Sequence, residues 1–428
     1  MTFPENPQPG GDDIIQFGWP ARRRSRWLGS LLLACLVAAA VLAIVTRHSG
    51  PRAAVQPQSP SLPLTPAPVV SNVGHPILGI RAGWQLFGLA GGLLDQSLVS
   101  GGSDVVAVQF AHGRIVRTAF PPLASSGPVS FVVARNKVIV RPLDYVPGYV
   151  IRDGKPARPL TGILAQGGTL LPGPGLSQQW FHQGFSFRTA PSAGEGNWLQ
   201  FDPASVLLIG PDAKPTGLAL PTPSGTHSPV FAMADGRGDV VLVDSGGAMY
   251  DAGPGLLRPI GAQLIAIGPT TWLGVSCAGG ACRDVIVSPA AGTTKALHGQ
   301  PITATARTSL PGVVTPGIVA RGVVAPGVVA SGLVAPDGAT AAVVLPGRQD
   351  GTGTLELINL ATGTDTHVDV PVGAPSYQQL AWSPDGQWLF AVTSHGTLAA
   401  ISMRTGRVED LRLGVSGLSQ IAIRPASG

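Results

Sequence analysis

Charged residues are scarce in this sequence of 428 residues, where they make up 12%, about half of the usual share. Glutamate is especially rare: beyond the first few residues only Glu195, Glu356 and Glu409 occur. The 28 basic residues outnumber the 23 acidic ones by five, and they form no stripe with interleaved aromatic side chains. The sequence therefore predicts no nucleic-acid binding.

Motifs for catalysis and for metal or cofactor binding are missing as well. The eight histidines are scattered without HExxH or HxH spacing, and no G-x-S-x-G, GxxxxGK[ST] or GxGxxG segment occurs. We therefore predict no catalytic residue, no metal site and no cofactor. Aspartates from separate segments can still meet as the two facing carboxylates that a glycosidase needs, and the sequence leaves this possibility open.

Helical periodicity is absent beyond residue 76. Glycine and proline, with 58 and 41 residues, form nearly a quarter of the sequence, whereas apolar residues form 44% of it. So many turn-forming residues argue against long helices, and so many apolar residues argue against disorder. Short strands joined by tight turns account for both, and the sequence predicts an all-β domain.

One apolar run stands apart from this pattern, at residues 28–45, where LGSLLLACLVAAAVLAIV contains no charge. Its length suits a bilayer core of ~30 Å. Four arginines within residues 22–26 precede it and two within 47–52 follow it, which places the N-terminus in the cytoplasm. We expect a short disordered cytoplasmic tail at 1–26, a single-pass transmembrane helix at 27–46, and an extracytoplasmic remainder.

Three other fates of this run are possible. A cleaved signal peptide has a shorter apolar run and a small-residue cleavage site, whereas this run ends in Val45-Thr46-Arg47-His48. Leu32-Leu33-Ala34-Cys35 resembles a bacterial lipobox, although ten more apolar residues follow Cys35 where a polar linker is usual. The arginine run matches a twin-arginine signal poorly, because Arg26 stands where an apolar residue belongs. A membrane anchor is the prediction.

Two low-complexity segments flank or interrupt the all-β region. Residues 47–76 form a Pro-rich linker, with seven prolines between positions 49 and 76, and such a segment behaves as a semi-rigid spacer. Within 308–333, glycine recurs every five residues in PGVVT PGIVA RGVVA PGVVA SGLVA, which resembles an elastin-like run. We interpret it as a flexible Gly/Val-rich insertion, with an apolar contact site for a partner or wall polymer as the alternative.

Apolar strands recur at a nearly constant period in residues 77–428. They begin near Trp84, Phe131, Trp180, Phe231, Trp272, Val343 and Trp388. Periods of 40–50 residues are typical of propeller blades, and only the interval that contains the insertion is much longer. The sequence predicts a β-propeller of about seven four-stranded blades. Closure requires the C-terminal SQIAIRP to pair near ILGIRAGWQL.

Turn motifs point to a family of propellers. Ser383-Pro384-Asp385-Gly386 lies between QLAW and QWLFAV, and a second Pro-Asp-Gly turn precedes ATAAVVL. The AWSPDG-x-W-L-F string resembles the repeat of TolB-like and WD40-like β-propellers. Residues 240–261 and 271–293 resemble uncharacterised, membrane-anchored bacterial propeller proteins from GC-rich genomes. These resemblances imply a fold and a location but no activity, and they imply that the turn aspartates are structural.

Cysteine is nearly absent, with three residues in all. Cys35 lies in the apolar run, whereas Cys277 and Cys282 flank Ala-Gly-Gly-Ala between two apolar strands. Residues that flank so short a hairpin loop face each other, and an extracytoplasmic domain is in an oxidising compartment. We predict a Cys277–Cys282 disulfide. The alternatives, a redox-active or a metal-binding pair, are disfavoured because no histidine lies nearer than His298.

These observations favour a function without catalysis. We expect a membrane-anchored extracytoplasmic β-propeller that acts as a binding or scaffolding module for a protein or cell-wall component. The alternative is an extracytoplasmic hydrolase or lyase with acidic residues at the propeller channel. A purely structural subunit is a third reading.

Overall fold

The computed structural model describes part of the chain, and the described residues belong to a compact unit that begins at residue 63. They are residues 66–91, 103–121, 123, 129–142, 148–161, 169–173, 179–183, 188–191, 197–200, 205–210, 214–221, 223, 229–244, 248–278, 281–298, 332–346, 352–373, 378–415 and 417–426. The predicted tail, the transmembrane helix, most of the linker and nearly all of the insertion lie outside them. Among the described residues, no helix is long and apolar enough to cross a membrane.

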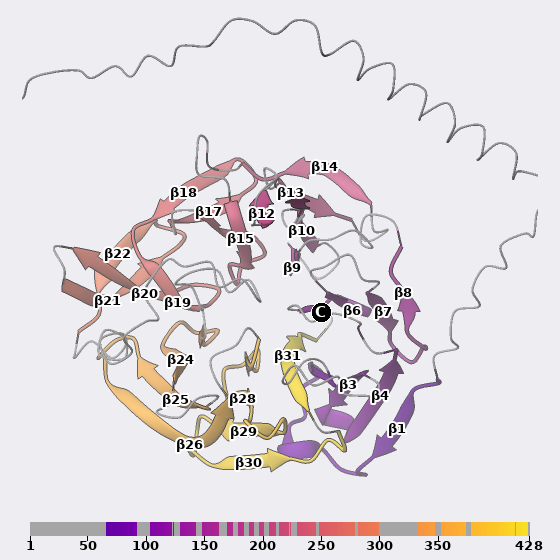
Figure 1. Ribbon diagram of the computed structural model, residues 1–428. Helices are drawn as coiled ribbons and strands as arrows, with labels where there is room; N and C mark the ends of the chain where they lie inside the picture. The colour runs from indigo at the N-terminus through magenta and orange to yellow at the C-terminus, as the bar shows by residue number, and fades with distance from the viewer. Residues whose placement is uncertain are drawn as a thin grey trace, which may run out of the picture. The chain divides into compact units, whose positions relative to one another are not determined.

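The described chain is almost entirely β-strand, arranged as successive antiparallel meanders that we call blades (Figure 1). Blade 1 holds β2 (Gln85–Ala90), β3 (Ser103–Gln109) and β4 (Arg114–Phe120), with β31 (Leu418–Arg424) inside and β1 (Val69–Asn72) outside. Blade 2 holds β5 (Val129–Val133), β6 (Lys137–Pro142), β7 (Tyr149–Arg152) and β8 (Arg158–Pro159). Blade 3 holds β9 (Thr169–Pro172), β10 (Gln179–Gln183), β13 (Ser205–Ile209) and β14 (Pro215–Ala219).

Blades 4 to 7 follow the same order from inside to outside. Blade 4 holds β15 (Pro229–Ala234), β16 (Val240–Asp244), β17 (Met249–Gly253) and β18 (Leu256–Ile260). Blade 5 holds β19 (Gln263–Ile267), β20 (Trp272–Ala278), β21 (Ala281–Ser288) and β22 (Thr293–Ala296). Blade 6 holds β23 (Gly332–Val334), β24 (Thr340–Pro346), β25 (Thr352–Asn359) and β26 (Asp365–Gly373). Blade 7 holds β27 (Leu380–Trp382), β28 (Trp388–Val392), β29 (Leu398–Ser402) and β30 (Val408–Leu411).

Three short features complete this arrangement. The hairpin of β11 (Arg188–Pro191) and β12 (Asn197–Gln200) interrupts blade 3 between β10 and β13. Two 3₁₀ turns, η1 (Ile77–Gly79) and η2 (Phe110–His112), lie in blade 1. The inner strands β19 and β23 pair in parallel at one end, which joins blades 5 and 6 and shows that neighbouring inner strands run in the same direction.

The two ends of the described chain meet in blade 1. β31 pairs antiparallel with β2, from Gln85 opposite Arg424 to Ala90 opposite Leu418, and Figure 1 shows β31 in yellow beside the purple strands of that blade. The Arg424 guanidinium stacks over Phe87 at 4.4 Å and pairs with Asp153 of blade 2 at 2.6 Å. The predicted pairing of the C-terminal segment with the first apolar strand is confirmed, as is the count of seven blades.

Apolar side chains fill the boundaries between neighbouring blades. Each of the seven hydrophobic clusters among the described residues joins two adjacent blades, including blades 7 and 1. In the cluster between blades 7 and 1, the Trp84, Phe110 and Phe390 rings lie 4.7–5.8 Å apart. A middle strand packs against the neighbouring blade on each of its two faces, so β16 is fully buried and is apolar from Val240 to Val243. The outer strand β26 instead alternates between exposed and buried residues.

Two predicted boundaries need correction. β1 falls inside the predicted linker 47–76 and pairs with β4 as a fifth strand, but all four of its residues are exposed, so it has no apolar pattern to reveal it. The predicted insertion 308–333 overlaps β23, where residues 332 and 333 already pair with β24. The seven recurring segments do fall on seven different blades, although those near Phe131 and Phe231 are inner strands and the others are second strands.

Candidate functional site

The two ends of the blades differ in how the strands are connected. Each blade has four strands of alternating direction, and all blades start at the same end. Links between blades and second-to-third-strand connections therefore lie on one face, which we call the loop face. It contains the facing ends of β2 and β3, of β10 and β13, and of β22 and β23, which residues 91–102, 184–204 and 297–331 connect. First-to-second and third-to-fourth connections lie on the opposite turn face and have at most six residues, as at 173–178. The connection 73–84 between β1 and β2 joins strand ends on this face as well and is longer.

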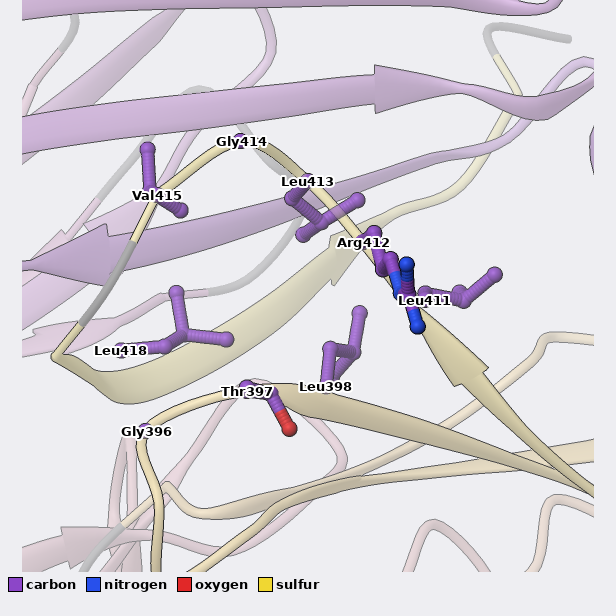
Figure 2. A pocket seen from close by; sticks show the side chains of 9 residues that line it. All are labelled: Gly396, Thr397, Leu398, Leu411, Arg412, Leu413, Gly414, Val415 and Leu418. Carbon is purple, nitrogen blue, oxygen red and sulfur yellow. The ribbon is translucent and has the colours of Figure 1, made fainter.

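A cavity of about 360 Å³ opens on the loop face between blades 7 and 1. Figure 2 shows its wall, which consists of the β28–β29 connection, the segment between β30 and β31, and the start of β31. The lining residues are Gly396, Thr397, Leu398, Leu411, Arg412, Leu413, Gly414, Val415 and Leu418. The volume lies within the range of ligand pockets, about 300–1,000 Å³.

The disulfide lies on the loop face as well. Cys277 and Cys282 are directly opposed in the β20–β21 ladder, with Cα atoms 4.1 Å apart, and their sulfurs are bonded. The strands extend one residue beyond each cysteine, to Ala278 and Ala281, so the connection is only residues 279–280. The predicted disulfide is confirmed, and it ties the end of this hairpin on the loop face.

Carboxylates and guanidinium groups gather on the turn face of blades 4 and 5. The Arg237 guanidinium joins Asp235 and Asp251, each at 2.7 Å, and lies 5.4 Å from the ring centroid of Trp272. Arg258 donates to the other oxygen of Asp251 at 2.7 Å and to the carbonyl of Pro289 in the next blade. Asp235 and Asp251 are fully buried, so these pairs compensate their charges inside the protein.

One carboxylate of this group differs from the others. Burial raises the pKa of Asp239 above its ordinary value, and Asp235 and Asp251 raise it further, while Arg237 opposes them. Asp235 accepts bonds from the backbone N–H groups of Arg237, Gly238 and Asp239, as expected for an Asx turn. The sequence left open whether aspartates from separate segments come together. Asp235, Asp239 and Asp251 do so on the turn face, where their network forms a turn and joins blades 4 and 5.

The other turn aspartates have the structural role that the resemblance implies. Asp385 accepts from the backbone N–H of Gln387, and Asp337 accepts from that of Ala339. Gly386 follows with φ +68°, a conformation that glycine adopts without strain. Within the described ranges, no three His, Cys, Asp or Glu side chains are placed to hold a metal ion.

Sequence reasoning missed the polar residues that join inner strands. Gln378 and Gln420 donate side-chain N–H groups to the backbone carbonyls of Phe131 and Val129, both at 2.9 Å. These bonds connect blades 7 and 1 to the free edge of β5 in blade 2. Arg141 in β6 of blade 2 is also buried, and its burial lowers its pKa to about 10. No local sequence signal marks these residues, because their partners lie in other blades.

Ring closure through β31 and the order of the strands in every blade decide the architecture. The domain is a β-propeller. Solved structures with a similar fold include the periplasmic gluconolactonase of Pseudomonas aeruginosa (12% identity, 80% of this chain and 99% of that chain, TM-score 0.45). TolB from Acinetobacter baumannii is another (12% identity, 80% of this chain and 67% of that chain, TM-score 0.39). A functionally unknown protein from Desulfotomaculum acetoxidans is a third (13% identity, 80% of this chain and 99% of that chain, TM-score 0.41). The predicted TolB-like propeller is confirmed at the level of the fold.

The other comparisons give no relatives. No family model matches the sequence, and no curated protein matches it.

Proposed function

We propose that this chain is a membrane-anchored, extracytoplasmic β-propeller that binds or scaffolds a protein or cell-wall component through its loop face. The observation that carries this proposal is the asymmetry between the two faces. Apart from residues 73–84, the connections on the turn face have at most six residues, whereas the strands joined by the two longest connections, 184–204 and 297–331, end on the loop face, where the cavity and the disulfide-tied hairpin also lie. Recognition residues in proteins are concentrated on such loops, held by a rigid scaffold.

The scaffold supports this role because it is closed and continuously packed. Apolar clusters join every pair of neighbouring blades, and β31 closes the ring against β2. Closure of the ring pairs the first and last blades, so the loops extend from a frame that does not unravel at its ends. A rigid frame lowers the entropy that binding loops lose when a partner is bound.

The location is supported by the sequence and by the thiols. The uncharged run at 28–45 with its flanking arginines is suited to a single-pass anchor whose N-terminus is cytoplasmic. Disulfides persist in oxidising compartments and are rare in the cytosol, and Cys277 and Cys282 form one. Both features agree with a propeller held outside the cell by its N-terminal segment.

A hydrolase or lyase is less well supported by the described residues. Its carboxylates should face a substrate, whereas Asp235 and Asp251 are buried and paired with Arg237 and Arg258 on the turn face. Removal of these ion pairs to free the carboxylates would leave buried charges uncompensated. Binding is therefore the function that the arrangement favours.

The two faces can be compared within one blade. His395 and Thr405 are exposed at opposite ends of β29, the first on the loop face and the second on the turn face. We would replace each in turn by a photo-reactive phenylalanine in the full chain, expressed in its own membrane, and irradiate intact cells. We expect a discrete crosslinked adduct, to a protein or to wall polymer, from position 395 and none from position 405. An adduct from position 405 alone, or from neither position, would contradict the proposal.

A further inference from the structure

The loop-face cavity has an apolar interior. Five of its lining residues are leucine or valine. Leu398, Leu413 and Leu418 are buried, whereas Leu411 and Val415 are only partly buried and offer apolar surface to the space. Figure 2 shows the leucines from both sides of the space, on the β30–β31 segment and on β29 and β31. Its volume of about 360 Å³ is near the lower end of the range of ligand pockets. Such a space favours an aliphatic chain over a polar ligand.

A single cationic group lines this apolar space. Arg412 is exposed, and among the described residues it takes part in no ion pair. The nearby Arg117 is differently placed, because it pairs with Asp104 at 3.2 Å and donates to the carbonyl of Gly414 at 3.1 Å. Asp104 and Arg117 therefore compensate each other, and Arg412 leaves one positive charge at the cavity. A guanidinium of this kind binds a carboxylate through two parallel hydrogen bonds.

We propose that this cavity binds a free medium-chain fatty acid, with the alkyl chain along Leu411, Leu413 and Val415 and the carboxylate on Arg412. The volume, near the lower end of the ligand-pocket range, suits a medium-length alkyl chain rather than a larger lipid. A single peptide side chain with a terminal carboxylate would leave most of the space empty. The ligand of this proposal differs from that of the proposed function, although both lie on the loop face: a protein or wall partner would contact the exposed residues around the cavity, such as His395, and the fatty acid would lie inside it.

The probe is decanoic acid with a diazirine on its alkyl chain, added to the full chain in lipid nanodiscs. After irradiation and trypsin digestion, we expect the label on peptide 413–428, which contains Leu413, Val415 and Leu418. A tenfold excess of decanoate should compete with the label. Decylamine, which partitions into lipid but carries the opposite charge, should not, and nor should an acetylated dipeptide that ends in leucine.

The charge is tested with two arginines on opposite faces of blade 7. Arg412→Gln should lower labelling about five-fold, a modest factor because the guanidinium is exposed to water. This variant lacks the trypsin site after position 412, so its label is measured on peptide 408–428. Arg404→Gln removes the same charge from the turn face, where Arg404 is exposed, and should leave labelling unchanged. Equal melting temperatures would show that both variants fold. The proposal is overturned if the label spreads along the chain, if decylamine or the dipeptide competes as well as decanoate, or if both variants lose labelling equally.

Discussion

Truncation of Ile421 to alanine tests the closure of the ring. Ile421 is 1% exposed in β31, its backbone pairs with Gly88 of β2, and its side chain belongs to the cluster between blades 7 and 1. It also donates its backbone N–H to the carbonyl of Gln378 at 2.8 Å, which the substitution leaves in place. The change therefore removes apolar packing and spares the strand pairing.

The expected cost is large for one residue. Replacement of a buried isoleucine by alanine costs about 2–5 kcal/mol, since it removes transfer free energy and leaves a cavity. The value should be near the middle of that range, because Trp84, Phe390 and the other rigid members of the cluster limit collapse around the gap. Val408→Ala is the control, because Val408 is 40% exposed on the outer strand β30 and its truncation should cost less than about 0.5 kcal/mol.

Urea unfolding of the full chain, followed by near-ultraviolet circular dichroism, measures both changes. We expect the urea midpoint of Ile421→Ala to fall well below that of the parent protein, and the midpoint of Val408→Ala to stay close to that of the parent. Equal midpoints for the two variants would refute the reasoning, because β31 would then contribute no more than an exposed outer strand. A second, earlier transition confined to Ile421→Ala would show instead that blade 1 opens before the rest of the ring.

Four further predictions concern the cluster on blades 4 and 5, the thiols, the insertion and the topology. Asp239→Asn should raise the melting temperature at pH 7, and this gain should vanish near pH 4. The reason is that the pKa of Asp239 is raised in the folded protein, so its contribution to stability is present at low pH and is lost as the pH rises through that pKa. Cys277 and Cys282 should resist alkylation until a reductant is added, and reduction should cost about 2 kcal/mol because the loop is short; free labelling without reductant would contradict the bond. Deletion of residues 308–331 should leave the far-ultraviolet spectrum and the melting temperature almost unchanged, since β23 begins at Gly332; loss of cooperative unfolding would show that the segment is part of the fold. Protease added to intact spheroplasts should degrade the chain beyond about residue 50, and full protection of that part would reverse the proposed orientation.

Features that depend on neighbouring residues were predictable from the sequence. Second strands such as WLFAV are apolar throughout because both of their sides are buried, so the blades can be counted along the chain. Pro-Asp-Gly turns are determined by the φ preferences of their own residues. The disulfide was predictable for the same reason, because Cys277 and Cys282 are five positions apart and a hairpin of that length opposes them.

Other features depend on which blades become neighbours, and only the tertiary structure decides them. β1 was missed because its four residues are exposed and its pairing with β4 relies on backbone hydrogen bonds, which any sequence can form. Gln378 meets Phe131 from 247 positions away, and Gln420 meets Val129 from 291. The cavity is lined by Leu398 of blade 7 and Leu418 of blade 1, so it exists only once these two blades are neighbours. The hydrophobic pattern of the sequence identifies the strands. The packing between blades determines where polar side chains meet and where cavities form, and a binding site consists of such features.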